Sequence, residues 1–289
     1  MKLALGTVQF GLDYGVTGNP RIPINETHEI LSLAMSAGVD ILDTAPSYGD
    51  SEKIIGQWLN DEPGSFRVIT KVPRLNKTQV PVDTIQKTFQ DSLEQLGVDS
   101  VYALLLHNVS DLMGAYGKQV FTAMQNIQSK GLAERIGISV YSPEEIDFVI
   151  SQYPIQIVQA PFNVIDQRLL QDGILRRLKE ADIEIHVRSV FLQGLLLLTE
   201  EKIPSYFSPW SGLLKQYRTW CSDTGGSLVA ACLQFVYEQA MIDKIIVGVD
   251  SISHFRELLD VTQSATTLPD ATHLACVDKG LINPTCWPQ

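Results

Sequence analysis

The chain has 289 residues, of which 45% are hydrophobic, and it carries a formal net charge of −11 with a pI near 4.9. This length suits one large hydrophobic core, and α/β barrels reach it as a single domain. The negative charge argues against nucleic acid or an anionic membrane surface as a partner, because such partners need clustered Lys and Arg side chains.

Short apolar or β-branched runs alternate with longer amphipathic runs, a pattern typical of strand-helix units around a parallel sheet. Eight strands are predicted, at residues 3–6, 39–43, 67–71, 101–106, 135–139, 155–160, 184–189 and 244–248. Helices are predicted at residues 51–59, 82–96, 117–130, 172–180, 227–238 and 253–262. Two further helices are marked by caps, one from Asn25 to Gly38 and one that begins at Ser142. Eight strands close a (β/α)8 TIM barrel, expected here as one domain over residues 1–289.

Two segments fall outside this alternation. Residues 193–226 contain two prolines and several glycines and are predicted to be irregular. A connection of this length usually covers or shapes a site. The C-terminal tail, from about residue 266 to 289, is expected to pack across one face, and both a substrate lid and a structural wrap remain open interpretations.

The termini and the cysteines indicate a cytoplasmic protein. The first apolar run is too short for a secretory signal, and no run approaches the ~18 apolar residues of a membrane span. Cys221, Cys232, Cys276 and Cys286 are widely spaced, so neither a disulfide framework nor a metal site follows from them. We expect a monomer or small homo-oligomer with no nucleic-acid, membrane or metal partner.

Four polar residues fall at the carboxyl ends of predicted strands. Asp43 ends the second strand, and Tyr48 lies on the loop beyond it, in the stretch Asp-Thr-Ala-Pro-Ser-Tyr-Gly-Asp-Ser-Glu at 43 to 52. Lys71 ends the third strand, and His107 follows the fourth. In a parallel barrel these ends meet at one mouth, so we expect the four side chains to converge.

These residue types together are suited to proton donation. A free phenol has a pKa of ~10 and is a poor acid near neutrality. A neighbouring ammonium lowers the pKa of the phenol, a carboxylate holds the ammonium in place, and an imidazole orients the substrate oxygen. The set therefore predicts that Tyr48 protonates a carbonyl oxygen as it becomes an alkoxide.

On these residues the chain resembles the aldo-keto reductase family over nearly its whole length. The stretch from 43 to 52 is the most specific match. The supporting motifs are Leu5-Gly6-Thr7, Thr70-Lys71, the Leu-Leu-His run ending at His107, Ile136 to Ser139, Gln159 to Asn163, Gln193 to Leu196 and Ile246 to Ser251.

The resemblance implies a barrel that binds NADP(H) or NAD(H) and transfers a hydride to an aldehyde or ketone, a small-molecule carbonyl substrate. Tyr48 would be the general acid, Lys71 and Asp43 would tune it, and His107 would orient the carbonyl. Ser139 and Gln159 would hold the nicotinamide carboxamide. The cofactor-binding residues implied by the resemblance are Gly6, Thr7, Asp43, Ser139, Gln159, Arg188, Gln193, Gly194, Leu195, Gly248, Ser251 and Arg256.

Three positions depart from the family pattern. Val140 stands where Asn usually follows the serine that grips the carboxamide. Arg188 stands where a Tyr commonly stacks on the nicotinamide ring, and its guanidinium suits either stacking or a substrate carboxylate or phosphate. Asp250 replaces the Lys or Arg that contacts the 2′-phosphate of NADPH, while Arg256 is retained, so we hypothesise relaxed or NADH-leaning specificity.

Substrate and activity leave alternatives open. Rim residues would suit a hydroxylated carbonyl such as a sugar; the candidates are Phe10, Tyr14, Asn108, Tyr141, Phe162, Asn163, Arg188 and Trp210. A dinucleotide-binding regulatory or redox-sensing barrel with little turnover is the alternative function. Schiff-base lyase chemistry at Lys71 is a third hypothesis, which the Asp43 and Tyr48 pattern fits less well than reduction.

Overall fold

The eight predicted strands form a closed parallel barrel. The computed structural model describes residues 1–64, 66–75, 81–263 and 268–288. The strands are β1 (Leu3–Gly6), β2 (Ile41–Asp43), β3 (Arg67–Val72), β4 (Val101–Leu106), β5 (Ala133–Ser139), β6 (Ile157–Pro161), β7 (Glu184–Arg188) and β8 (Lys244–Gly248). Each strand pairs with the next in parallel, and β8 closes the ring against β1. The predicted (β/α)8 barrel is confirmed.

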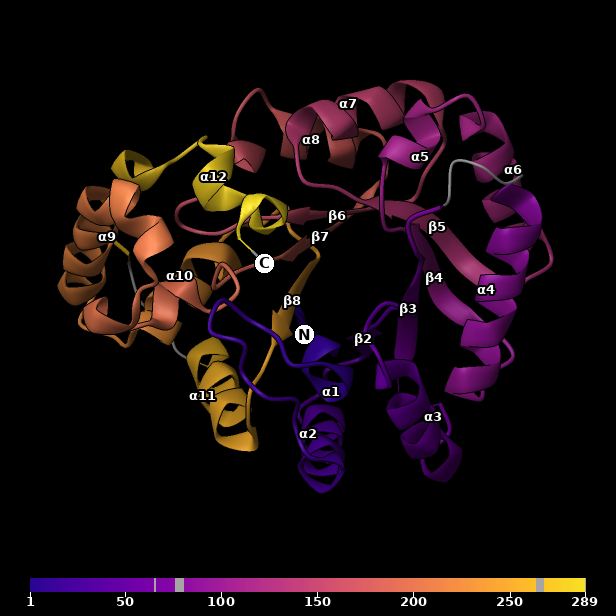
Figure 1. The fold of residues 1–289 in the computed structure, drawn as a ribbon, viewed down its shortest axis with the longest axis horizontal. Coiled ribbons are helices and arrows are strands. Elements are labelled where there is room, and N and C mark those ends of the chain that lie inside the picture. Colours follow the sequence, from indigo (N-terminus) through magenta and orange to yellow (C-terminus); the bar gives the residue numbers. More distant parts are fainter. Residues whose placement is uncertain (65, 76–80, 264–267, 289) are drawn as a thin grey trace.

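An outer ring of helices surrounds the strands (Figure 1). Its members are α2 (Ile24–Ser36), α3 (Ser51–Asp61), α4 (Pro81–Leu96), α6 (Gly117–Ser129), α7 (Pro143–Gln152), α8 (Ile174–Glu180), α10 (Leu228–Tyr237) and α11 (Ile252–Thr262). Two short helices, α1 (Val8–Gly11) and α5 (Ser110–Met113), follow β1 and β4. In the described part of the chain, no helix combines the length and the hydropathy needed to cross a membrane.

The two predicted helix caps had different outcomes. Ser142 caps α7 as predicted: its hydroxyl accepts a hydrogen bond from the Glu145 amide, and the Glu145 carboxylate accepts one from the Ser142 amide. The cap predicted at Asn25 is wrong. The helix begins one residue earlier, at Ile24 after Pro23, and Asn25 is an exposed residue of its first turn. A preceding proline in extended conformation sets this helix start without a side-chain cap.

The prediction that residues 193–226 are irregular is also wrong. This segment contains three short 3₁₀ helices (Leu195–Leu197, Glu200–Lys202 and Ser205–Trp210) and the 13-residue helix α9 (Ser211–Asp223). Leu214, Tyr217 and Cys221 lie on its buried face at the i, i+3, i+7 spacing of an amphipathic helix. Prolines and glycines that flank this pattern mark its ends rather than its absence.

The described part of the C-terminal tail, residues 268–288, packs on α9, on the 3₁₀ helix Ser205–Trp210 and on the loop that follows β6. The Trp220 indole donates a hydrogen bond to the Pro269 carbonyl, and the Tyr206 hydroxyl donates one to the Gly280 carbonyl. The tail helix α12 (Lys279–Ile282) lies beside the 3₁₀ helix Ser205–Trp210, since the Trp210 indole donates a hydrogen bond to Asp278, the residue before α12. The first two tail residues, 266 and 267, lie outside the described residues.

The barrel strands alternate between two hydrophobic layers. Leu3, Leu5 and Leu42 face the outer helices, whereas Ala4 and Ile41 belong to a small inner cluster inside the barrel. Because successive side chains of a strand point to opposite faces, the residue two positions after each inner apolar residue also points inward. These last inward positions, at the carboxyl ends of the strands, hold three of the four predicted catalytic residues.

Candidate active site

Three of the predicted site residues extend the inner apolar rows of their strands. Asp43 follows the inner residue Ile41 on β2 by two positions, and Lys71 likewise follows Ile69 on β3. His107 occupies the corresponding position after Leu105 of β4. The strand register therefore carries all three side chains to the same mouth, although 64 positions of sequence separate the first from the last.

Asp43 and Lys71 form a buried ion pair. The Lys71 ammonium donates to Asp43 Oδ1 at 2.6 Å and to the Thr44 carbonyl at 2.9 Å. The second carboxylate oxygen of Asp43 accepts from the Gln159 amide at 2.7 Å, and Gln159 accepts from the Ser139 hydroxyl at 3.1 Å. Burial lowers the pKa of Lys71, and the Asp43 carboxylate opposes this shift. The carboxylate holds the ammonium in one place and keeps its charge compensated.

Tyr48 lies beside this pair, with its hydroxyl 3.4 Å from the Lys71 ammonium. The expected lowering of its pKa does not occur. Burial is the largest effect and raises the pKa of the phenol, the Asp43 carboxylate raises it further, and the Arg188 guanidinium partly opposes them. The expectation left out the effect of burial on the phenol and the effect of the Asp43 charge on it, which offsets that of the ammonium. The phenol is therefore fully protonated near neutral pH.

A glycine contact holds the turn that carries Tyr48. A Cβ added to Gly11, at the end of α1, would lie 1.9 Å from the Tyr48 carbonyl oxygen. Gly49 has a φ of +58°, and its own Cβ would lie 2.5 Å from the Gly11 carbonyl oxygen. The two backbones approach so closely that neither position accommodates a side chain. Gly11 was not recognised from the sequence, because its partner lies 37 positions away.

His107 packs edge-on against Tyr48, with 6.0 Å between ring centroids. Its Nδ1 lies 3.4 Å from the Ser47 hydroxyl. Burial lowers the pKa of the imidazole to about 4, and the nearby positive charges of Lys71 and Arg188 add to this shift. The ring is therefore neutral at pH 7 and keeps one N–H for hydrogen bonding.

The last two residues of the 43-to-52 stretch position the others. The buried Ser51 hydroxyl lies within hydrogen-bond distance of the carbonyl and hydroxyl oxygens of Thr7, the residue after β1. It also lies 3.0 Å from the Thr44 hydroxyl. Glu52 accepts a hydrogen bond of 2.5 Å from Thr70, the residue before Lys71. The start of α3 is thereby tied to β1, β2 and β3, which fixes the loop between Asp43 and Ser51. In the sequence, the only indication that Ser51 and Glu52 support the site was their position in the 43-to-52 stretch that resembles the family motif.

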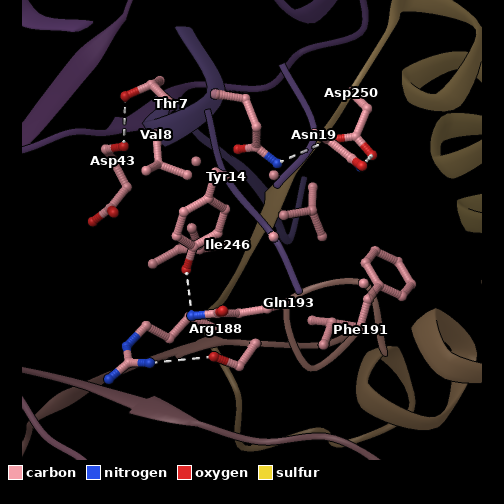
Figure 2. Close-up of a pocket in the computed structure, with 18 of the residues that line it drawn as sticks. Thr7, Val8, Tyr14, Asn19, Asp43, Arg188, Phe191, Gln193, Ile246 and Asp250 are labelled. Atoms are coloured by element: carbon pink, nitrogen blue, oxygen red, sulfur yellow. Dashed lines mark hydrogen bonds between the residues drawn. The ribbon is translucent and has the colours of Figure 1, made fainter. Parts of the chain in front are cut away.

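A cavity of about 310 Å³ opens beside Tyr48 and is lined by the ends of β1, β7 and β8. Figure 2 shows side chains from these segments facing one another across it. The predicted site residues that line it are Gly6, Thr7, Asp43, Tyr48, His107, Arg188, Gln193, Gly194 and Gly248. The others, Lys71, Ser139, Gln159, Leu195, Ser251 and Arg256, do not line it. Lys71, Ser139, Gln159 and Leu195 are buried, Ser251 caps α11, and Arg256 is exposed.

The loop after α1 crosses the cavity and joins its walls (Figure 2). The Gln193 amide donates to the Tyr14 hydroxyl at 3.0 Å, and the Val16 amide donates to the Gln193 carbonyl at 2.9 Å. The Asn19 amide donates to the Asp250 carboxylate at 3.0 Å. Asn19 was not recognised from the sequence, because its partner lies 231 positions away.

The candidate rim residues divide into two groups. Tyr14, Tyr141 and Arg188 line the cavity. The others do not: Phe10 and Phe162 are buried in the core, Asn163 is buried and bonded to the Ser189 carbonyl, Asn108 bonds the Ser110 amide, and the Trp210 indole bonds Asp278. Aromatic and amide residues near strand ends therefore serve both the cavity and the loops that support it.

Comparison with known proteins identifies the family to which this chain belongs. The model of the aldo/keto reductase family matches residues 2–277. The chain is 26% identical over 263 residues to a D-threo-aldose 1-dehydrogenase from Pseudomonas sp, covering 78% of this chain and 79% of that protein. It is 25% identical over 288 residues to an L-galactose dehydrogenase from Arabidopsis thaliana, covering 92% and 89%.

A solved structure is similar in fold. It is the holo form of an aldo-keto reductase from Bacillus halodurans, which superimposes with a TM-score of 0.76 at 19% identity, over 94% of this chain and 90% of that one. The match of the family model across nearly the whole chain confirms the resemblance predicted from the strand-end motifs, and the protein belongs to the aldo/keto reductase family of oxidoreductases.

Proposed function

We propose that the protein reduces an aldehyde or ketone to an alcohol with a nicotinamide dinucleotide, and that Tyr48 is the proton donor. The observation that carries the proposal is the grouping of Tyr48, Lys71, Asp43 and His107 beside the cavity. Such a set provides a proton, a charge that stabilises the phenolate and a neutral hydrogen-bond donor.

Tyr48, His107 and Lys71 have separate roles in the proposed proton transfer. The reduced nicotinamide, when bound, supplies the hydride. A substrate oxygen between Tyr48 and His107 receives an imidazole N–H hydrogen bond and takes the phenolic proton as its negative charge develops. The Lys71 ammonium, 3.4 Å from the phenol oxygen, stabilises the phenolate that remains. The raised pKa keeps the phenol protonated before the reaction, and the proton leaves only when a stronger base, the alkoxide, develops on the substrate.

The residues along the cavity fit a dinucleotide. Two buried polar atoms near its β8 end, Gln9 Oε1 and His254 Nε2, have no hydrogen-bond partner among the described residues. Gly248 leaves the cavity open there, since a Cβ at that position would lie 2.7 Å from the Gln9 side chain. We assign Gly6, Thr7 and Gly248 to the walls of the cofactor site and the Gln193–Gly194 turn to its cover.

We further propose that NADH is preferred over NADPH. Asp250 lines the cavity and presents a carboxylate, which would accept a hydrogen bond from a ribose 2′-hydroxyl and would repel a 2′-phosphate. Arg256 is exposed and does not line the cavity. Titrating each reduced cofactor while recording tryptophan fluorescence tests this preference, and clearly tighter binding of NADPH would refute it.

The substrate class we favour is a sugar or sugar-derived carbonyl. Two relatives are named as dehydrogenases of an aldose and of L-galactose. Tyr14, Tyr48 and Tyr141 line the cavity, and tyrosine offers both an aromatic face for a sugar ring and a hydroxyl for its hydroxyl groups.

A panel of aldoses and simple aldehydes, assayed by the loss of NADH or NADPH absorbance, tests the proposed reaction. Turnover of at least one class with either cofactor supports it. Tight binding of the dinucleotide with negligible turnover across the panel would instead favour the redox-sensing alternative. Borohydride trapping of a substrate on Lys71 would point to lyase chemistry, which a lysine held by a 2.6 Å ion pair does not favour.

A further inference from the structure

Arg188 is a cation fixed inside the cavity by neutral groups. It is the last residue of β7, paired with Pro161 of β6, and its side chain is partly buried. The guanidinium donates to the Val140 carbonyl at 2.9 Å and lies over the Tyr141 ring, 4.3 Å from its centroid. Its remaining hydrogen bonds go to the hydroxyls of Ser139, at 3.4 Å, and Ser189, at 3.2 Å.

The backbone around Arg188 is held as firmly as the side chain. Ser189 has a φ of +62°, a left-handed conformation that is unfavourable for a residue with a side chain. Its carbonyl accepts a hydrogen bond of 3.0 Å from the buried Asn163 amide, which keeps it there. The chain thus turns sharply just after Arg188, and the side chain has a defined starting direction.

No acidic group of the described residues compensates this charge. None of their carboxylates forms an ion pair with the guanidinium, and Asp43, which lines the same cavity, already binds Lys71 and Gln159. Arg168 shows how this fold compensates an arginine elsewhere, with two bonds of 2.7 Å to Asp166. Arginine has five N–H donors, so the three bonds of Arg188 leave two for a ligand.

The uncompensated charge lies at the reaction end of the cavity. Arg188 lines it together with Tyr48 and His107. Its positive charge helps to lower the pKa of His107 and opposes the raised pKa of Tyr48, as expected for a cation close to both. The pyrophosphate of a dinucleotide is separated from the reactive ring by a ribose, so a cation at this end is placed for the substrate.

We propose that Arg188 binds an anionic group of the substrate, a carboxylate or a phosphate, and so selects acidic carbonyl compounds for reduction at Tyr48. This inference rests on the proposed function and names the substrate class of that site. A planar guanidinium with two free N–H groups suits the paired oxygens of either anion. Sugar phosphates and sugar acids combine such an anion with the hydroxyl groups that the cavity tyrosines favour.

Matched substrate pairs test the inference. Glyceraldehyde 3-phosphate is compared with glyceraldehyde, and succinic semialdehyde with butanal, in the wild-type protein and in the Arg188→Met, Arg188→Lys and Arg177→Met variants. Arg177 is a suitable control, because it is an exposed arginine of α8 paired with Asp147. The wild type and the control should prefer the anionic member of at least one pair by roughly 10- to 100-fold in kcat/KM.

The variants separate charge from geometry. Arg188→Met should bring the ratio of kcat/KM for the anionic substrate to kcat/KM for its neutral partner close to one, and Arg188→Lys should retain part of the preference. The phosphate and carboxylate pairs show which anion is bound. The inference is overturned if wild type reduces the anionic and neutral substrates of both pairs with similar kcat/KM. It is also overturned if Arg188→Met still prefers the anionic substrate as strongly as wild type.

A binding measurement distinguishes failure of the inference from failure of the proposed reaction. Calorimetric titration with glycerol 3-phosphate and 4-hydroxybutyrate needs no turnover, and Arg188→Met should weaken binding by roughly tenfold or more. If no carbonyl is reduced but this loss is seen, the anion site stands and the reaction is wrong. If Arg188→Met weakens only the binding of the dinucleotide, the arginine serves the cofactor and the inference is overturned.

Discussion

Replacing Tyr48 with Phe isolates the phenolic hydroxyl from every other part of the site. The ring, its edge-on contact with His107 and the turn held by Gly11 all remain. The hydroxyl makes one hydrogen bond among the described residues, to Lys71 at 3.4 Å, which is longer than usual. Its loss should change the free energy of unfolding by no more than about 1 kcal/mol.

Activity should fall far more than stability. Positioned acid catalysis contributes about 10²- to 10⁴-fold, which corresponds to ~2.7–5.4 kcal/mol of transition-state stabilisation. We therefore expect kcat of Tyr48→Phe to fall by roughly two to four orders of magnitude, with little change in the Kd of the dinucleotide. The loss should appear in kcat and in kcat/KM alike, because the proton moves only in the transition state.

The assay compares the variant with wild type and with Tyr116→Phe, the same change at a tyrosine that is 44% exposed. Steady-state reduction, cofactor titration and urea unfolding are measured on all three proteins. Activity of Tyr48→Phe within a few-fold of wild type would refute the proton-donor role. If the free energy of unfolding of Tyr48→Phe falls by as much as its transition-state stabilisation, the hydroxyl has a structural role instead.

Four further changes give distinct outcomes. Lys71→Met should destabilise the protein by about 3–5 kcal/mol in urea unfolding, because it leaves the Asp43 carboxylate buried without its partner, and unchanged stability would contradict the buried pair. Gly11→Ala should lower both Tm and kcat, since its Cβ would collide with the backbone of the turn that carries Tyr48, and a fully active variant would exclude that contact. Asp250→Ser should bring the Kd values for NADH and NADPH closer together, because the repulsion of the 2′-phosphate is lost. An unchanged ratio of the two Kd values would show that the carboxylate does not determine cofactor preference. Burial raises the pKa of Glu184, but hydrogen bonds from His186 and Tyr102 and the charge of Arg135 outweigh it and lower the pKa from 4.5 to about 2. The stabilisation by this carboxylate is therefore present above pH 4.5 and is lost as the pH falls towards 2. Unfolding curves of Glu184→Gln should lack this pH dependence, and an unchanged dependence would contradict the role of Glu184.

The sequence by itself determined the barrel and the members of the proposed catalytic group. Eight β-branched runs separated by amphipathic runs predict eight parallel strands, and strand alternation carries Asp43 and Lys71 to the inner face at the strand ends. These features depend on local periodicity, which the tertiary structure preserves because a one-residue shift would turn every inner side chain outward. The sequence of α9 is amphipathic too, but the prolines and glycines on either side of it led to the prediction of an irregular segment.

Only the tertiary structure decided how these residues act on one another. The bond from Gln159 to Asp43 spans 116 positions, and the bond from Asn19 to Asp250 spans 231, distances over which sequence spacing carries no information. Burial, which reverses the expected pKa shift of Tyr48, depends on how the whole barrel mouth is packed. The same holds for the charge of Arg188: its residue type was evident from the start, but the lack of an acidic partner among the described residues became visible only when distant strand ends were brought together.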